Sequence, residues 1–431
     1  MIQLSLYLSS IVLVTGTVFS QGSLNPPGAP GPTMKTLGQI EPRIPIESLP
    51  FRITNQGSYY MTGNLLIPPA QAGITIETNN VTLDLAGFTI RGFPTSLQGI
   101  LLSGSLSHVT VQNGGITGAS AGIDGTASTR VQVRNIRASD CRGTGISLGN
   151  ESLLENCQAN QNLGSGVKTG AESQILNCQG NGNIQNGIEA GNSSILRDCS
   201  ANKNTGSGIV AGDGTKLSFV TANENAIDGI AGGTGVNISD STAQANKTDG
   251  IGLTISGLIT RTSVSYNLRY GIIVQTWGSI GECYAMGNGW VGIAAGENAQ
   301  IFNSKADGNA GGGFAAQRGS TIRDCSANRN SFDGIAVSAE CTVIRNTCNR
   351  NVDVKVASGI HALGTDNIIQ ENTVISNDRG IAVDVEGNMI VKNTLNNNTL
   401  NLYTTGDQTL GPVVTVLDPS VPNDPLSNYI F

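Results

Sequence analysis

The sequence repeats itself with a period of 21 residues. A Gly followed by an apolar residue marks each unit, and ten such glycines are separated by this interval: Gly145, Gly166, Gly187, Gly208, Gly229, Gly250, Gly271, Gly292, Gly313 and Gly334. The marker continues less regularly at Gly99 and Gly122 before this block and at Gly359 and Gly380 after it. A repeat of this length predicts a stacked array, which grows without closing a new core, so we expect one long repeat domain.

Several positions of the unit always carry one kind of side chain. The ninth residue after the marker is aliphatic, as in Leu154 and Ile175. The seventeenth is Asn in every unit: Asn162, Asn183, Asn204, Asn225, Asn246, Asn267, Asn288, Asn309, Asn330 and Asn351. Asn tolerates a left-handed bend, and its amide can bond to backbone or to the Asn of the next unit. The column therefore predicts a structural ladder at a tight bend.

The apolar residues indicate strands. They fall two apart in short bursts, such as Ile146 with Leu148 and Cys157 with Ala159, and Gly, Asn and Ser separate the bursts. This alternation predicts short strands joined by bends. Such strands cannot bury their inward faces alone, so successive units must stack strand on strand. We predict an all-β fold, a single-stranded right-handed parallel β-helix of about 14 coils with capping segments at both ends.

The two ends of the chain differ from the repeat. Residues 1–20 contain an apolar run from Leu4 to Val14, too short to span a membrane, and are predicted to be a signal peptide. Residues 21–44 are rich in Pro and Gly and are predicted to be a tether. We expect the β-helix with its N-terminal cap over 45–398 and a C-terminal cap over 399–431. The mature protein is then secreted or held at the cell surface, without a membrane span.

Charge excludes one class of partner. The formal net charge is -7, and only 13% of the residues are charged. Nucleic acid binding requires a clustered basic face, so no nucleic acid partner is predicted.

The cysteines and histidines do not indicate a metal centre. Five of the eight cysteines share one position of the unit, twelve residues after the marker: Cys157, Cys178, Cys199, Cys283 and Cys325. This pattern favours buried thiols over disulfides, and only Cys341 with Cys348 is a pair to test for a local bridge. No CxxC motif is present, and the two histidines, His108 and His361, belong to distant coils. We therefore predict no metal site and interpret each lone His as solvated.

The Gly-marked, Asn-rich coils resemble the right-handed parallel β-helix (pectin-lyase-like) superfamily, which contains pectate lyases, polygalacturonases and many exported bacterial proteins. The resemblance covers nearly everything from Leu49 to Asn398. Two segments of this chain look like the first coils of exported bacterial β-helix proteins of unassigned activity: SLPFRITNQGSYYMTGNL and ITIETNNVTLDLAGFTIRG. A third, GPVVTVLDPSVPNDPLSNYIF, looks like their terminal segment. The resemblance implies the fold and bacterial export. It implies no activity, because the polygalacturonase and pectate lyase motifs have no counterpart in this chain.

One region is rich in aromatic residues. Both Trp and three Tyr lie between residues 266 and 290, together with one Arg. Aromatic rings beside Arg and Asp can stack on a sugar ring and hydrogen-bond its hydroxyl groups. We predict a carbohydrate-binding patch of Tyr266, Arg269, Tyr270, Trp277, Tyr284 and Trp290. The alternative is that these side chains only cover the surface of the coils.

A catalytic version of the patch is the competing hypothesis. In a polysaccharide lyase acting on a uronate polymer, Arg269 or Lys247 would be the base and Tyr270 the proton donor. Asp228 and Asp249 would hold Ca²⁺, the one cofactor considered. In a glycoside hydrolase the same two carboxylates would form the catalytic pair. Without catalysis, we expect no cofactor.

An outward column of small residues suggests a third possibility. The second residue after the marker is apolar or Gly in consecutive units: Val210, Ala231, Gly252, Ile273, Ala294, Ala315 and Ala336. Such a face could lie against another surface. The protein would then be a structural or adhesive rod that oligomerises through this face.

Overall fold

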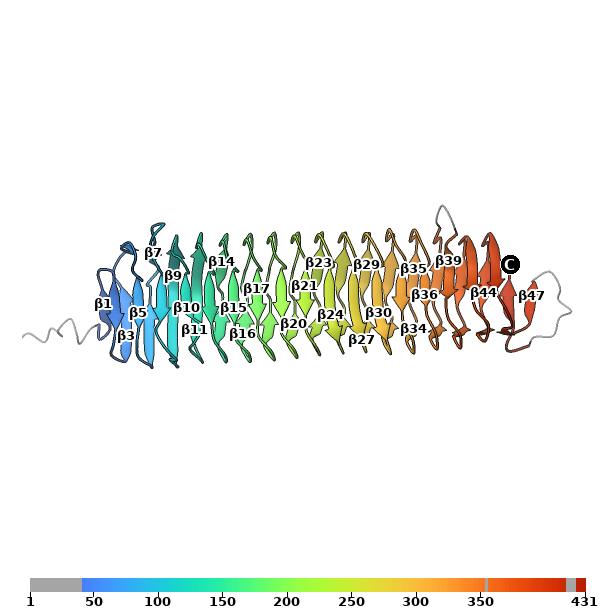
Figure 1. Cartoon of the computed structure of the whole chain (residues 1–431), viewed down its shortest axis with the longest axis horizontal. Helices are drawn as coiled ribbons and strands as arrows, with labels where there is room; N and C mark the ends of the chain where they lie inside the picture. Colours follow the sequence, from blue (N-terminus) through green and yellow to red (C-terminus); the bar gives the residue numbers. More distant parts are fainter. Residues whose placement is uncertain (1–40, 353–355, 416–423) are drawn as a thin grey trace, which may run out of the picture. The chain divides into compact units, whose positions relative to one another are not determined.

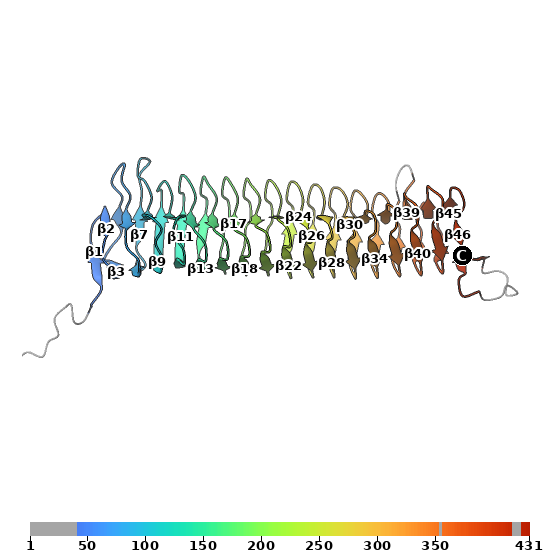
Figure 2. The same ribbon diagram turned by 60° about the horizontal axis from the view of Figure 1, so that its bottom comes forward.

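The computed structural model describes residues 41–352, 356–415 and 424–431. The chain divides into two compact units, Met1–Pro42 and Arg43–Phe431. The predicted signal peptide and most of the predicted tether lie outside the described residues. The second unit is a parallel β-helix, in which each coil stacks on the one before it (Figure 1, Figure 2). The described residues include no helix long and apolar enough to cross a membrane.

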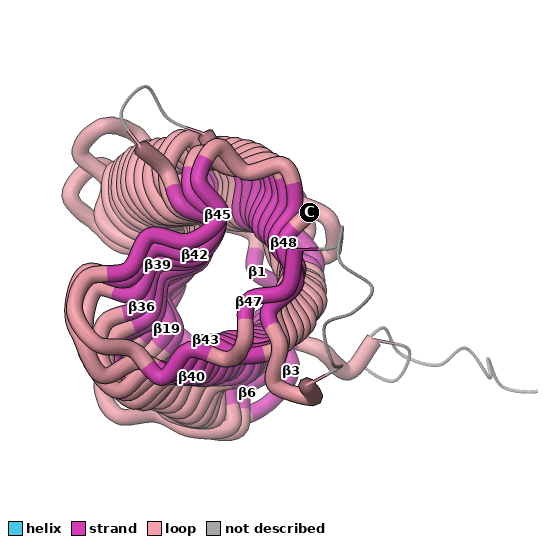
Figure 3. Tube along the Cα trace, turned by 90° about the vertical axis from the view of Figure 1, so that its right-hand side faces the viewer, coloured by secondary structure: helices cyan, strands magenta, loops and turns pink. Residues whose placement is uncertain are grey.

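A typical coil contains three short strands. In the coil that begins at Gly145 these are β12 (Ile146–Leu148), β13 (Leu153–Glu155) and β14 (Gln158–Asn160). We call the stacks of strands at these three positions of the coil the first, second and third sheet; in the N-terminal coils the second and third are continuous through β9 and β11. Viewed along the axis of the coils, the three sheets surround a common interior (Figure 3).

The first sheet receives one strand from every coil. Its 17 strands are β2 (Phe51–Ile53), β5 (Ile74–Ile76), β8 (Ile100–Leu102), β10 (Ile123–Gly125), β12, β15 (Val167–Thr169), β17 (Ile188–Ala190), β19 (Ile209–Ala211), β21 (Ile230–Gly232), β24 (Ile251–Ile255), β27 (Ile272–Thr276), β30 (Ile293–Glu297), β33 (Phe314–Ala316), β36 (Ile335–Val337), β39 (Ser358–Ala362), β42 (Arg379–Val383) and β45 (Leu400–Thr404). The predicted number of about 14 coils was too low, because it counted marker glycines of the regular block and its flanks. The three further coils have Pro50, Gly73 and Asn401 at that corner.

The second and third sheets cover the rest of the coil. The second sheet comprises β1 (Ile44–Ile46), β3 (Gly57–Met61), β6 (Val81–Asp84), β9 (Val109–Thr117), β11 (Gln132–Ser139), β13, β16 (Gln174–Leu176), β18 (Ile195–Arg197), β20 (Lys216–Ser218), β22 (Asn237–Ser239), β25 (Leu258–Thr260), β28 (Ser279–Gly281), β31 (Gln300–Phe302), β34 (Thr321–Arg323), β37 (Thr342–Ile344), β40 (Ile368–Gln370), β43 (Met389–Val391) and β46 (Thr409–Leu410). The third sheet comprises β4 (Leu65–Leu66), β7 (Thr89–Arg91), β14, β23 (Thr242–Gln244), β26 (Ser263–Ser265), β29 (Tyr284–Met286), β32 (Lys305–Asp307), β35 (Ser326–Asn328), β38 (Thr347–Asn349), β41 (Thr373–Ile375), β44 (Thr394–Asn396), β47 (Val413–Thr415) and β48 (Asn428–Ile430). The long strands β9 and β11 run through both sheets.

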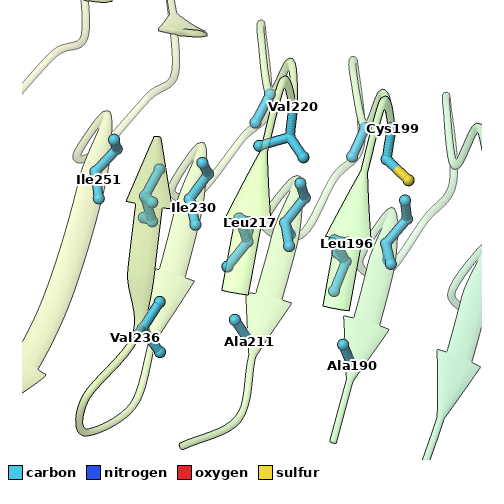
Figure 4. Packing of buried hydrophobic residues seen from close by; sticks show 14 of the residues in the cluster. Ala190, Leu196, Cys199, Ala211, Leu217, Val220, Ile230, Val236 and Ile251 are labelled. Atoms are coloured by element: carbon cyan, nitrogen blue, oxygen red, sulfur yellow. The ribbon is translucent and has the colours of Figure 1, made fainter. Parts of the chain in front are cut away.

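The core follows from the alternation of side chains along each strand. Leu154 pairs in register with Ile175, and Ile175 with Leu196, so the aliphatic column predicted from the sequence is confirmed. Leu196, Leu217 and Cys199 point into the interior from consecutive coils (Figure 4). Stacking like side chains at the strand spacing of ~4.8 Å lets each coil bury its apolar face against its neighbours.

The Asn column forms a continuous ladder inside the bend. The backbone N–H and the amide Nδ2 of Asn204 both donate to Oδ1 of Asn225, each at 3.0 Å. Asn225 makes the same two bonds to Asn246, at 2.9 and 3.0 Å. The predicted single file of Asn side chains is therefore confirmed, and its members are buried.

The cysteines are free thiols. All eight are buried, and Cys341 and Cys348 are not bonded to each other. Burial raises the pKa of Cys199 to about 11 and that of Cys141 to about 12. At neutral pH these side chains are therefore protonated and act as small apolar groups.

Candidate binding groove

The outer face of the first sheet is hollowed into a groove. The second residue after each marker points outward, because side chains alternate along a strand. Between Gly252 and Ala336 this position carries small or aliphatic side chains, which keep the floor low. A pocket of about 520 Å³ lies on it, lined among others by Tyr270, Ile273, Gln275, Ala294, Ala315, Gln317, Ala336, Ser338 and Leu363.

One margin of the groove is the turn that leads into each marker Gly. Trp290 and Val291 belong to this turn before Gly292, and Phe332 belongs to it two coils later, before Gly334. A second hollow of about 530 Å³ lies against it, lined among others by Trp290, Phe332 and Asp333. The two hollows share Val291, Ala315 and Ala336, so they form one surface feature. We call it the groove. The opposite margin carries the amides of Gln275 and Gln317.

An aromatic and arginine cluster stands at the turn margin. The rings of Tyr270 and Trp290 meet edge to face, with centroids 5.3 Å apart and planes at 80°. The guanidinium of Arg269 lies 4.8 Å from the Trp290 centroid, and its Nε lies 3.8 Å from Oδ1 of Asp249. The structure thus brings together Arg269, Tyr270 and Trp290 of the predicted patch.

The other predicted patch residues lie elsewhere. Tyr284 lies on β29 of the third sheet, where its hydroxyl donates to Sδ of Met286 at 3.1 Å. Tyr266 lies at the corner just after β26 of the same sheet. Trp277 occupies the turn between β27 and β28 and is 65% exposed. The sequence reasoning grouped these residues by closeness along the chain, whereas the face of a residue depends on its position within the coil.

Asp228 and Asp249 occupy equivalent positions in consecutive coils, one residue before the marker. Oδ1 of Asp228 accepts the backbone N–H of Asp249, and Oδ1 of Asp249 accepts that of Tyr270, each at 3.1 Å. Thr248 also donates to Asp228. The two Oδ2 atoms converge over Gly252: a Cβ on this residue would lie 3.9 Å from Asp249 Oδ2 and 4.0 Å from Asp228 Oδ2. Both carboxylates therefore face the floor.

The environment of Asp249 disfavours its charge. Burial raises the pKa of this carboxyl group, and the negative charge of Asp228 acts in the same direction. The hydrogen bond from Tyr270 and the charge of Arg269 oppose the rise only in part. Lys247, two residues earlier, is exposed at the outer rim of the same turn.

A second polar cluster closes the other end of the groove. His361 occupies the floor position after Ala336, and its Nδ1 lies 2.9 Å from Oδ2 of Asp333. Its Nε2 lies 3.1 Å from Oδ2 of Asp384. Oδ1 of Asp333 accepts the backbone N–H of Ser358 at 2.7 Å. Three consecutive coils are therefore linked by one imidazole.

The two carboxylates change the titration of His361. Burial of the ring is the largest influence and by itself would lower the pKa, but the hydrogen bonds and charges of Asp333 and Asp384 together outweigh it. The pKa of His361 is therefore raised above its ordinary value.

The sequence interpretation of His361 as a solvated side chain was wrong. Asp333 stands one residue before its marker, as Asp228 and Asp249 do, and His361 stands two residues after its own, as Ala336 does. These offsets place the side chains on one face, so the register could have revealed the cluster. Among the described residues, no group of three or more His, Cys, Asp or Glu side chains is arranged to hold a metal ion.

Comparisons with known proteins bear on the fold. The sequence matches a family model described as right handed beta helix region over residues 72–227, 225–365 and 282–410. No curated protein has a sequence that matches this chain.

Solved structures with a similar fold are distant in sequence. The A-module of the mannuronan C-5 epimerase AlgE6 from Azotobacter vinelandii is 17% identical, with 83% of this chain and 90% of that chain covered and a TM-score of 0.35. The periplasmic alginate epimerase AlgG is 11% identical, with 88% and 78% covered and a TM-score of 0.28. The catalytic domain of a GH87 α-1,3-glucanase is 13% identical, with 71% and 58% covered and a TM-score of 0.33. At these identities the likeness concerns the fold alone. Because the family model matches most of the sequence, the chain belongs to the right-handed β-helix family.

Proposed function

We propose that this protein binds an extended carbohydrate chain along the groove. The observation that carries the proposal is the combination of an open apolar floor with an aromatic pair at one margin and side-chain amides at the other. Apolar and aromatic surfaces receive the faces of sugar rings, and amides exchange hydrogen bonds with their hydroxyl groups.

The geometry of the coils suits a linear polymer. Equivalent positions recur at the strand spacing of ~4.8 Å, which is close to the length of one sugar unit in an extended chain. Gln275 and Gln317 stand two coils apart on one margin, and Tyr270 and Trp290 stand in adjacent coils on the other. A chain lying along the coils would therefore meet similar contacts at successive units.

We further propose that the protein is exported and acts as a binding and scaffold module outside the cytoplasm. Support comes from residues 1–20, which read as a signal peptide, and from the Pro/Gly-rich segment 21–44, which reads as a tether. A tethered β-helix would present the groove to extracellular polymers.

A side chain placed on the floor tests the assignment. Ala315→Trp fills the centre of the groove from an outward position, so the core is left unchanged. Val210→Trp, in the same outward column five coils earlier, is the matched control. Calorimetric titration with neutral, amino-sugar and uronate oligosaccharides should show binding by the wild type. The affinity should fall roughly tenfold or more in Ala315→Trp and stay unchanged in Val210→Trp. Equal binding by the wild type and both variants would place the site elsewhere. If the wild type binds none of the sugars, a purely structural or adhesive rod would be favoured.

Cleavage of the bound chain is the second candidate function, and the cluster at His361 favours it. An imidazole held by two carboxylates on the groove floor can accept and donate a proton. Arg269 is a poor base because a guanidinium keeps its proton, and it is stacked on Trp290. His361 is therefore a better candidate base than Arg269, and Lys247, the other base predicted from the sequence, is exposed at the outer rim of its turn.

Product analysis separates binding from cleavage. Incubation of the wild type with the same sugars, including uronate polymers with and without Ca²⁺, should yield new reducing ends or unsaturated products if the protein is a hydrolase or a lyase. His361→Gln should then lose the products while it keeps binding. Binding without products in the wild type would show that the groove only binds.

A further inference from the structure

We infer that the groove selects a glycan that carries free amino groups, such as a polymer of glucosamine. This inference rests on the proposed function, since it names the class of carbohydrate that the groove would take. It comes from the charges around the groove, not from the fold.

Carboxylates outnumber the cationic groups that face the groove. Four of them belong to the floor margins of the described coils: Asp228, Asp249, Asp333 and Asp384. Against them stand three cationic groups. Arg269 pairs with Asp249 and lies over Trp290 at 4.8 Å, and Arg379 lies over Tyr403 at 4.0 Å. The third is His361, which is cationic when protonated and lies between Asp333 and Asp384. A polyuronate would bring further carboxylates against this surface and would be repelled.

Asp249 provides an acceptor that is prepared for a cation. Its residue is only 8% exposed, and Oδ1 is occupied by the Tyr270 N–H and by Arg269. Within the described part of the chain, no donor is bonded to its Oδ2, which faces the space above Gly252 beside Oδ2 of Asp228. Arg269 offsets one of these two charges, so a neutral sugar would leave a net negative charge at the pair, whereas an ammonium group above Gly252 would lie near both Oδ2 atoms.

The second carboxylate site lies at a distance that suits the same chain. From Asp249 to Asp333 the equivalent position advances four coils, which corresponds to ~19 Å at ~4.8 Å per coil. Between them lie Tyr270, Val291 and Gly312, which carry no charge. The groove therefore has a pair of carboxylates at each end, of which the second pair is bound to His361, and an apolar aromatic centre. An amino-sugar chain of a few units can place rings on the centre and ammonium groups at both ends.

The test compares three oligomers on the full-length protein by calorimetry. They are a glucosamine oligomer with free amines, an N-acetylglucosamine oligomer of the same length, and a uronate oligomer of the same length. Hydrogen bonds to charged groups predict that the free amine form binds about tenfold more tightly than the acetylated form. Its affinity should fall as salt is added, because screening weakens the ion pairs.

Paired variants show which carboxylates cause the preference. Asp228→Asn with Asp249→Asn removes both charges and keeps the ladder, since Asn186 holds the same position and accepts the Ser207 N–H at 2.9 Å. The glucosamine oligomer should then bind about tenfold more weakly, and the acetylated oligomer within about twofold of wild type, which also shows that the variant is folded. Asp198→Asn, at an exposed corner between the second and third sheets, is the control and should change neither.

Each other outcome has a distinct meaning. Equal affinity for the free and acetylated oligomers, or tighter binding of the uronate oligomer, would overturn the inference and leave the proposed groove intact. An equal loss in Asp198→Asn would mean that the amines bind to the acidic surface in general, which also overturns it. Failure of all three oligomers to bind would remove the proposed function itself.

Discussion

A single Asn side chain shows how this fold is stabilised at the residue scale. Oδ1 of Asn225 accepts two hydrogen bonds from Asn204, and Nδ2 of Asn225 donates to Asn246 and to the carbonyl oxygen of Ala201 at 3.0 Å. Asn225 is completely buried, so water cannot replace these partners. The amide satisfies both its own polar atoms and those of the two neighbouring coils, which is why the ten regular units carry only Asn in this column. In the preceding coil the position is Cys141, whose N–H donates to Oδ1 of Asn162 at 3.0 Å.

Asn225→Ala should therefore be strongly destabilising. The change leaves the backbone N–H of Asn204, one of the two Nδ2 hydrogens of Asn204 and the carbonyl of Ala201 without partners, while Nδ2 still donates to the Gly180 carbonyl at 2.9 Å. At about 1–3 kcal/mol for each buried group, we expect a loss of about 3 kcal/mol or more. Asn202→Ala is the matched control: Oδ1 of Asn202 accepts the Asn223 N–H at 2.8 Å on the half-exposed third sheet, where water can substitute. Its cost should stay below about 1 kcal/mol. Urea unfolding of both variants measures the difference, and equal losses would show that the ladder contributes little.

His361 predicts a stability that depends on pH. The pKa is raised in the folded protein, so the contribution of the charged imidazole is fully present below its ordinary pKa of 6.5 and is lost as the pH rises through the folded pKa. Thermal unfolding of the wild type and His361→Gln should thus show a larger advantage of the wild type at about pH 5 than at about pH 9. An advantage that grows with pH, or that does not change, would mean that Asp333 and Asp384 do not stabilise the protonated ring.

At the scale of elements, the groove coincides with a change in the first sheet. Its strands have three residues in β19 and β21 and five in β24, β27 and β30. The longer strands extend the hydrogen-bonded surface toward Gln275. The small side chains at Gly252, Ala294 and Ala315 keep this surface low. Because β33 and β36 have only three residues but also form part of the floor, strand length shapes the groove over β27 and β30, and the small side chains shape it over its whole length.

The last strand of the chain lies between β44 and β47 in the third sheet and completes one of the Asn ladders. β48 pairs with both strands, and Oδ1 of Asn428 accepts the N–H and Nδ2 of Asn393 at 3.0 and 3.1 Å. Nδ2 of Asn428 donates in turn to the carbonyl of Ile390 at 2.9 Å.

Removal of residues 424–431 should therefore promote association. It leaves β44 as an unpaired edge and exposes part of the core near Leu395. Exposed strand edges recruit further strands, so the truncated protein should form oligomers or aggregates in light scattering after size exclusion. The conservative change Tyr429→Phe keeps the strand and the Asn428 amide and should remain unassociated. A truncated protein that stays as dispersed as the full chain would show that this strand does not protect the edge.

At the scale of the whole molecule, the register determines both what the sequence could predict and what it could not. The fold could be predicted from the repeat, because a column of aliphatic residues such as Leu154, Ile175 and Leu196 is explained when successive units pair in register. The placement of Asp228, Asp249, Arg269, Tyr270 and Trp290 in one region also followed, since they share the turn before the marker.

The rest of the site could not be read from closeness in sequence. Tyr266, Trp277 and Tyr284 are near Trp290 along the chain, but they stand at other points of the coil and so on other faces. His361 is 28 residues from Asp333 and 23 from Asp384, and the marker interval between Gly334 and Gly359 departs from the regular spacing. The floor was visible only as a column of small residues, because the height of the two margins depends on turns of irregular sequence.

The central claim, that sugar binds in the groove, has a direct optical test because the chain has two Trp residues, one at the groove and one away from it. Trp277→Phe leaves Trp290 as the only reporter, and Trp290→Phe leaves Trp277. Titration with the tightest-binding oligosaccharide should give a saturable change of emission in Trp277→Phe, with the affinity found by calorimetry for the wild type. Emission in Trp290→Phe should stay unchanged. A change in Trp290→Phe, or a silent Trp290 while calorimetry still detects binding, would contradict the assignment of the groove.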